Sequence, residues 1–186
     1  ILEHQITFFK KYGINNFTII VNYLKDSIKD YFKDGERWGV EITYIEEDKK
    51  FGTAGSLTQN CHSLPNQFIV VYCDYFLNFN LNKFIYFHNS KGNSLATVIA
   101  QKNTWPHEAD HIEYDNQSRI TKLIHRPFGA GQKIKNCAIT GLYICKKDLL
   151  KYFTLNKEDQ SFEKDLVPNA VSANQSIYAY LTDEYI

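Results

Sequence analysis

The chain has 186 residues, of which 44% are hydrophobic and 15% aromatic, enough apolar surface for the core of one domain and too much for an intrinsically disordered chain. Its 21 basic and 21 acidic residues are mixed along the sequence, so we expect no nucleic-acid partner bound through bulk charge. No apolar run approaches the roughly 20 residues of a membrane span, so we expect no membrane partner.

The first half of the sequence alternates between helical and strand patterns. Leu2, Ile6 and Phe9 recur at helical spacing, and Gly13 follows as a helix end. Short runs of β-branched and aromatic residues separate the later helical stretches. We expect helices over 2–11, 24–32 and 54–61, and strands over 17–21, 40–44 and 68–73. This rhythm predicts a parallel sheet with helices on both faces.

The second half is richer in strands. We expect a helix over 81–88, strands over 95–100, 111–114, 120–124 and 138–145, helices over 149–153 and 162–171, and a strand over 177–181. No repeat or linker divides the chain, so residues 1–186 are expected to form a single domain. The predicted fold class is α/β, with a Rossmann-like, mixed and mainly parallel sheet flanked by helices.

Two candidate site segments follow predicted strands. Asp74 ends the apolar strand over 68–73, where a carboxylate needs water, a partner or a cation, so a magnesium ligand and a cap for the next turn are both open. The segment 52–55, Gly-Thr-Ala-Gly, leaves backbone N–H groups accessible near a helix start, which suits a nucleoside or simply a tight turn. Because ligands bind at the carboxyl ends of parallel strands, the two segments are expected to face one site.

Two further segments carry chemistry in the second half. His125 and Arg126 close a strand before Pro127, and arginine presents a planar fork that matches phosphate oxygens. The alternative is a solvated strand end. Gly141 lies within a strand after Thr140, which indicates either the close approach of a group such as a sugar ring or a β-bulge. No Gly-x-Ser-x-Gly or His-Glu-x-x-His motif supports a hydrolase or a zinc protease.

Taken together, these segments resemble the sugar-phosphate nucleotidyltransferases, which make nucleoside-diphosphate sugars from a nucleoside triphosphate and a sugar 1-phosphate. The order of the segments along the chain is more specific than any one of them. The resemblance implies the nucleotide-diphospho-sugar transferase fold. The segments that carry it are 1–6, 11–14, 22–24, 28, 31–32, 34–35, 38–40, 47–49, 52–55, 74, 78–81, 125–127, 140–143, 162–168 and 183–186.

The resemblance also implies roles for individual residues. Asp74 matches the catalytic magnesium aspartate, with Mg²⁺ as the cofactor, and Arg126 matches the lysine of a Glu-Lys-Pro motif that meets the sugar phosphate. His125 stands in place of the glutamate of that motif. The implied nucleotide-binding residues are Glu47, Gly52, Thr53, Ala54 and Gly55. The implied sugar-phosphate-binding residues are His125, Arg126, Thr140, Gly141 and Glu163.

The family has a glycine-rich phosphate-binding signature that we expect just before Ile1, and a second magnesium aspartate that we expect after Ile186. The sequence therefore resembles a family core shortened at both ends. Losing those groups would slow a reaction that depends on positioning and charge neutralisation, so this chain could itself be inactive.

The function implied by the resemblance is transfer of a nucleotidyl group, with GTP favoured, to a mannose or heptose 1-phosphate, with release of pyrophosphate. Uridylyl or thymidylyl transfer to glucose 1-phosphate is the nearest alternative. A second hypothesis is a catalytically inactive module that binds a nucleotide sugar, and a third is an assembly domain that packs against its own copy. The product would feed lipopolysaccharide or other surface polysaccharide synthesis.

The four cysteines show no Cys-x-x-Cys spacing and lie in or beside apolar segments. This pattern favours buried thiols over disulfides or zinc ligands. We therefore expect the protein in a reducing cytoplasm.

Overall fold

The computed structural model describes residues 1–129, 134–153 and 159–186. Its α-helices are α1 (Leu2–Lys10), α2 (Lys25–Phe32), α3 (Gly52–Gln59), α4 (Leu81–Ser90) and α5 (Val167–Ser172). Its strands are β1 (Asn16–Val21), β2 (Glu41–Glu46), β3 (Gln67–Val71), β4 (Ala96–Gln101), β5 (His111–Tyr114), β6 (Ile120–Ile124), β7 (Ala138–Lys146) and β8 (Ile177–Leu181). Every predicted strand is present at its expected place.

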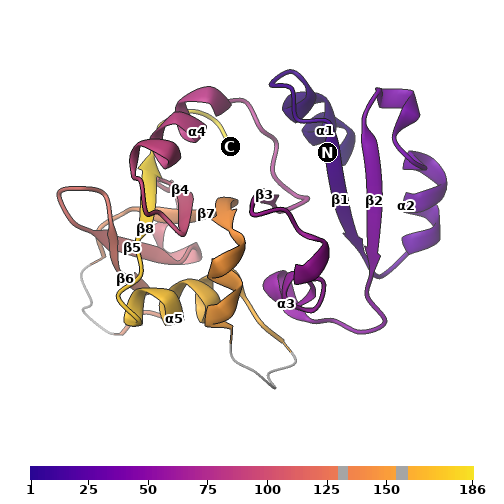
Figure 1. The fold of residues 1–186 in the computed structure, drawn as a ribbon. Helices are drawn as coiled ribbons and strands as arrows, with labels where there is room; N and C mark the ends of the chain where they lie inside the picture. The colour runs from indigo at the N-terminus through magenta and orange to yellow at the C-terminus, as the bar shows by residue number, and fades with distance from the viewer. Residues whose placement is uncertain (130–133, 154–158) are drawn as a thin grey trace.

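The strands form two sheets, which lie on opposite sides of Figure 1. The small sheet pairs β1 with β2 in parallel, and α2 covers its outer side (Figure 1). The larger sheet has the order β6-β5-β7-β4-β8, with β3 also paired to β7. The fold is thus α/β with a mixed sheet, as predicted.

Parallel pairing is less prevalent than the helix-strand rhythm indicates. The pairs β1–β2 and β4–β8 are parallel, whereas β7 runs antiparallel to β3, β4 and β5. The hairpin of β5 and β6 adds another antiparallel pair, and its turn is held by Asp115, whose carboxylate accepts backbone N–H bonds from Gln117 and Arg119. The long-range partners of a strand leave no local trace in the sequence, so the direction of β7 could not be read from it.

Strand β7 is the centre of the core because its side chains alternate between the two faces of the sheet. Leu142 and Ile144 pack with α1 and α4 on one face. Tyr143 and Cys145 pack on the other face with residues of α3, α5 and the π-helical turn Phe162–Leu166. Helices therefore cover both faces, and the π-helical turn is brought against the middle of β7.

Two expected helices take other forms. The segment predicted over 149–153 is the 3₁₀ helix Lys147–Tyr152, and the helix predicted over 162–171 is divided into the π-helical turn and α5. Ser161 caps the π-helical turn, since its side-chain oxygen accepts N–H bonds from Glu163 and Lys164. This cap fixes the place of the Glu163 side chain beside the sheet.

No helix among the residues described here is long and apolar enough to cross a lipid bilayer.

Candidate functional site

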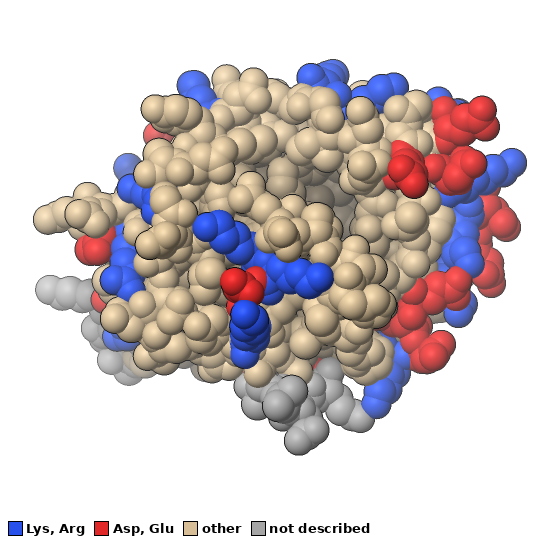
Figure 2. Space-filling view, in the orientation of Figure 1, with Lys and Arg blue, Asp and Glu red and all other residues tan. Residues whose placement is uncertain are grey.

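A cleft of about 520 Å³ opens beside the amino-terminal half of β7. The volume is in the range that holds a small ligand. Figure 2 shows a group of basic and acidic side chains near the middle of the face it presents, over the 3₁₀ helix Lys147–Tyr152; this group is separate from the cleft lining. The polar groups that line the cleft include Lys102, Glu108, Asp110, Arg126, Thr140, Glu163 and Lys164. Among the described residues the lining thus combines three cationic side chains with three carboxylates.

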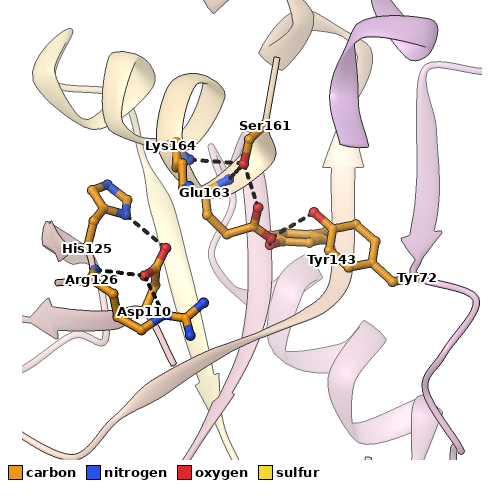
Figure 3. Close-up of polar contacts among 8 residues, drawn as sticks. All are labelled: Tyr72, Asp110, His125, Arg126, Tyr143, Ser161, Glu163 and Lys164. Atoms are coloured by element: carbon orange, nitrogen blue, oxygen red, sulfur yellow. Dashed lines mark hydrogen bonds and ion pairs between the residues drawn. The ribbon is translucent and has the colours of Figure 1, made fainter. Parts of the chain in front are cut away.

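Glu163 is held by hydroxyl groups from three parts of the chain (Figure 3). Tyr72 donates to Glu163 Oε1 over 2.7 Å, and Tyr143 donates to the same oxygen. Ser161 Oγ donates to Oε2 over 2.8 Å. A carboxylate has about four acceptor positions, and these three contacts leave one for a ligand hydroxyl in the cleft.

The two tyrosines that hold Glu163 keep their protons. Burial, together with the nearby Glu163 charge, raises the pKa of Tyr72, and burial raises the pKa of the fully buried Tyr143 well above its ordinary value. Both hydroxyls are therefore hydrogen-bond donors throughout the neutral range, and the Glu163 carboxylate is their acceptor.

Gly141 lies in β7 at the cleft wall, where no larger residue fits. A Cβ placed there would come within 2.4 Å of Tyr72 Cδ2 and 2.8 Å of Tyr75 Cε2. The backbone at this point is regular, since the Gly141 carbonyl accepts from the Tyr72 N–H over 2.9 Å. The glycine is thus explained by the two tyrosine rings that rest on it, and these rings form part of the cleft wall with it.

Asp110 joins His125 and Arg126 into a second polar group (Figure 3). One carboxylate oxygen lies 3.0 Å from His125 Nδ1, and the other accepts from the Arg126 backbone N–H over 3.1 Å and lies 3.5 Å from Arg126 Nε. Burial opposes ionisation of Asp110, but the hydrogen bonds from His125 and Arg126 outweigh it and lower the pKa of Asp110. The carboxylate is therefore charged at neutral pH.

The structure brings four of the predicted site residues to this cleft and a fifth beside it. Arg126, Thr140, Gly141 and Glu163 line the cleft, and His125 contacts its wall through Asp110. Thr140 is buried and donates to the Ile99 carbonyl, so its hydroxyl is engaged within the sheet.

The predicted nucleotide-binding segment forms the first turns of α3 and does not line the cleft. Ala54 and Gly55 are buried, and the Ala54 N–H donates to the Gln160 carbonyl over 3.1 Å. Thr53 accepts the Phe162 N–H, and a Cβ at Gly52 would meet the Gln160 carbonyl oxygen at 2.2 Å. The start of α3 is thus packed against the segment that leads into the π-helical turn.

Glu47 and Asp74 also lie outside the lining of the cleft. Glu47 accepts a hydrogen bond from Ser56 of α3. Asp74 is exposed on the turn after β3, which is held in place by the buried side-chain amide of Gln5, a donor to the Tyr72 and Tyr75 carbonyls. Tyr72 and Tyr75 line the cleft, so Asp74 stands next to its wall.

Sequence reasoning missed Lys102, Glu108, Asp110 and Lys164 as cleft residues, and Tyr72 and Tyr143 as the partners of Glu163. A lone charged residue is typical of a solvated surface, so these four charges gave no signal. The tyrosines look like core residues because of their aromatic surroundings. Only the position of Tyr72 next to Cys73 and Asp74, at a predicted site, could have drawn attention to it.

The sequence matches a family model described as Nucleotidyl transferase over residues 1–185. A Campylobacter jejuni protein, D-glycero-alpha-D-manno-heptose 1-phosphate guanylyltransferase, is 29% identical over 168 residues, which cover 90% of this chain and 71% of that protein. A Synechocystis protein, UTP–glucose-1-phosphate uridylyltransferase, is 25% identical over an alignment of 199 positions, gaps included, that covers 98% of this chain. The chain spans half the length of the Synechocystis protein.

The fold is shared with a solved structure of a putative glucose-1-phosphate thymidylyltransferase from Bacillus anthracis. The TM-score is 0.83 and the sequence identity is 17%, over 99% of this chain and 74% of that one. At this identity the likeness concerns the fold alone. Because the family match extends over nearly the whole chain, the chain belongs to the nucleotidyl transferase family.

Proposed function

We propose that the chain acts in nucleotidyl transfer from a nucleoside triphosphate, with GTP favoured, to a sugar 1-phosphate of the mannose or heptose type. The observation that carries the proposal is the cleft, in which Arg126, Lys102 and Lys164 offer positive charge to a phosphate while Glu163 offers an acceptor to a sugar hydroxyl. Membership of the nucleotidyl transferase family supports this use of the cleft.

In the proposed reaction, an oxygen of the sugar 1-phosphate attacks the α-phosphorus of the triphosphate. A new P–O bond forms, the bond between the α-phosphorus and the bridging oxygen breaks, and pyrophosphate leaves with that electron pair. Such transfers depend chiefly on positioning and charge neutralisation. Arg126 would hold the sugar phosphate, since a guanidinium matches phosphate oxygens.

Magnesium remains part of the proposal, with Asp74 as the residue that would hold it. No three His, Cys, Asp or Glu side chains gather into a metal site within the described ranges 1–129, 134–153 and 159–186. An exposed single carboxylate still fits Mg²⁺, which commonly binds through one or two carboxylates together with substrate phosphates and water. The ion would supply neutralisation of phosphate charge.

The nucleoside is proposed to lie against the start of α3, at Glu47 and Gly52, Thr53, Ala54 and Gly55. Ala54 and Gly55 are buried, so the nucleoside could contact the exposed Thr53, the neighbouring backbone and the half-buried Glu47 side chain. Thr53 connects this segment to the cleft, because it contacts Phe162, the neighbour of Glu163.

The choice of base and sugar rests on the relatives. The Campylobacter protein is named as a heptose 1-phosphate guanylyltransferase, which supports GTP and a heptose or mannose substrate. The Synechocystis protein is named as a glucose-1-phosphate uridylyltransferase, which supports the alternative of uridylyl or thymidylyl transfer to glucose 1-phosphate. Either product would be a precursor for surface polysaccharide synthesis, and the heptose product for lipopolysaccharide. We propose that the transfer takes place in the cytoplasm.

The test is isothermal titration of the chain with GTP, UTP and dTTP, with and without Mg²⁺, followed by a pyrophosphate-release assay with mannose, heptose or glucose 1-phosphate. Mg²⁺-dependent binding of GTP and release of pyrophosphate with mannose or heptose 1-phosphate would support the proposal. Turnover of UTP or dTTP with glucose 1-phosphate would select the alternative.

A catalytically inactive module that binds a nucleotide sugar is the second candidate. The charges of the cleft are consistent with it, because cationic side chains suit the diphosphate and Glu163 suits a hydroxyl of the sugar, and binding alone needs no further catalytic group. Binding of GDP-mannose or UDP-glucose without pyrophosphate release from any triphosphate would establish this candidate. Sedimentation of the chain would show whether it forms a homo-oligomer, the third hypothesis.

A further inference from the structure

Asp110 is more firmly placed than its position just before β5 suggests. Its carbonyl accepts the Ile139 N–H of β7 over 3.1 Å, and its side chain is only 11% exposed. The next residue, His111, is fully buried, with Nε2 2.6 Å from the Pro106 carbonyl oxygen and Nδ1 3.2 Å from the Cys137 backbone nitrogen. The backbone that carries the Asp110 carboxylate is therefore fixed on both sides.

The carboxylate uses both oxygens on the cleft wall. His125 Nδ1 engages one oxygen, which fixes the rotation of the group, and the other oxygen faces the backbone N–H and Nε of Arg126. These contacts involve neither Nη nitrogen of Arg126. The Arg126 side chain is 52% exposed and lines the cleft. An arginine so exposed would otherwise lose much rotational freedom when it binds an anion.

We propose that Asp110 is a positioning residue that holds Arg126 at the cleft wall with its Nη nitrogens available to the phosphate of a sugar 1-phosphate. The inference rests on the proposed function, because that function assigns the phosphate to Arg126. His125 assists by fixing the carboxylate. Preorganisation of this kind raises affinity by lowering the ordering cost of binding.

Because Asp110 is negatively charged, the direction in which its removal changes the affinity for phosphate tests the inference. If Asp110 acted on the ligand directly, its removal would relieve repulsion and strengthen phosphate binding. If it acts by holding Arg126, its removal weakens binding, and only while Arg126 is present. A double-mutant cycle separates these two cases, because it measures the coupling of the two side chains.

The experiment is isothermal titration of α-D-mannose 1-phosphate, α-D-glucose 1-phosphate and inorganic phosphate into the wild type, Asp110→Ala, Arg126→Ala and the double variant. We expect Arg126→Ala to weaken sugar 1-phosphate binding by about tenfold or more, as loss of a charge-assisted contact does. Asp110→Ala should weaken it by about threefold to tenfold, and should have no further effect in the Arg126→Ala background. The control Glu113→Gln removes an exposed carboxylate of the same strand β5 and should leave the affinity unchanged.

Melting temperatures establish that each variant is folded. If Asp110→Ala is unfolded, Asp110→Asn replaces it in the cycle, with the same sign and a smaller loss expected because its amide oxygen still accepts the Arg126 N–H. Tighter binding after loss of Asp110, or an equal loss with and without Arg126, would overturn the positioning role. No binding by the wild type, or an unchanged affinity in Arg126→Ala, would instead remove the proposed phosphate site.

Discussion

Tyr143 of β7 and Glu163 of the π-helical turn are joined by a hydrogen bond in which the buried hydroxyl donates to the carboxylate. Tyr72 donates to the same oxygen. The hydrogen bond from Tyr143 links the central strand to the π-helical turn. It also sets the direction in which Glu163 presents its remaining acceptor position to the cleft. Stability and ligand geometry therefore depend on the same group.

Tyr143→Phe removes one donor to Glu163 and leaves the ring packing in place. We expect a loss of about 1–3 kcal/mol in the free energy of unfolding, as for a hydrogen bond to a charged group. Urea unfolding measures the change. Tyr86→Phe is the control, because Tyr86 is 77% exposed and its hydroxyl should contribute little. Equal stability of Tyr143→Phe and the wild type would show that this hydrogen bond carries no net free energy.

Gly141→Ala places a methyl group where the Tyr72 and Tyr75 rings already lie, at 2.4 and 2.8 Å. We expect a cost of about 1–3 kcal/mol in the free energy of unfolding, since the rings must move to relieve the overlap. Urea unfolding again gives the value.

The matched control for Gly141→Ala is the same change in a Tyr72→Ala background. Removing the nearer ring should reduce the cost, although Tyr75 remains close. An identical cost in both backgrounds would mean that the Tyr72 ring is not the cause.

The sequence was most informative where a pattern is local. Helix α4 follows from apolar periodicity and strand β4 from a continuous apolar and β-branched run, and the Asn80 cap that accepts the Lys83 N–H fixes the start of α4. The division of the segment over 162–171 into a π-helical turn and α5 could not be read in the same way. It depends on the contact of Ser161 with Glu163 and on that of Glu163 with Tyr143 of β7.

The candidate site was only partly predictable because its members are far apart in the chain. Tyr72 and Glu163 are 91 residues apart, and Asp110 and Arg126 are 16 residues apart. The resemblance to a family selected Arg126, Gly141 and Glu163, which the fold brings to one cleft. It had no place for Asp110, whose role is visible only through its contacts.

Asp74→Asn tests the proposed magnesium ligand. The amide is close in size to the carboxylate but lacks its charge, so we expect Mg²⁺ to lose its enhancement of nucleotide binding, by about tenfold or more. Isothermal titration with GTP at increasing Mg²⁺ measures this effect. Asp30→Asn on α2, an exposed carboxylate outside the cleft lining, is the control. An undiminished Mg²⁺ effect in Asp74→Asn would remove the assignment.

The buried His88 ring leads us to expect a lower free energy of unfolding in mild acid. The ring is 2% exposed, and its Nδ1 lies 2.8 Å from Thr97 Oγ1. Burial, with a smaller contribution from the Lys146 charge, lowers the pKa of His88 from 6.5 to about 4. The unfolded chain therefore binds a proton below about pH 6.5 that the folded chain does not accept until about pH 4.

The sign follows from this difference in proton binding. The neutral ring contributes nothing to pH dependence above pH 6.5, and the free energy of unfolding falls as the pH drops from about 6.5 to about 4, by about 3 kcal/mol in all. Urea unfolding at half-unit pH steps measures the slope. His88→Gln, which cannot titrate, should show a flatter profile over the same window. Parallel profiles for His88→Gln and the wild type would assign the acid sensitivity to other groups.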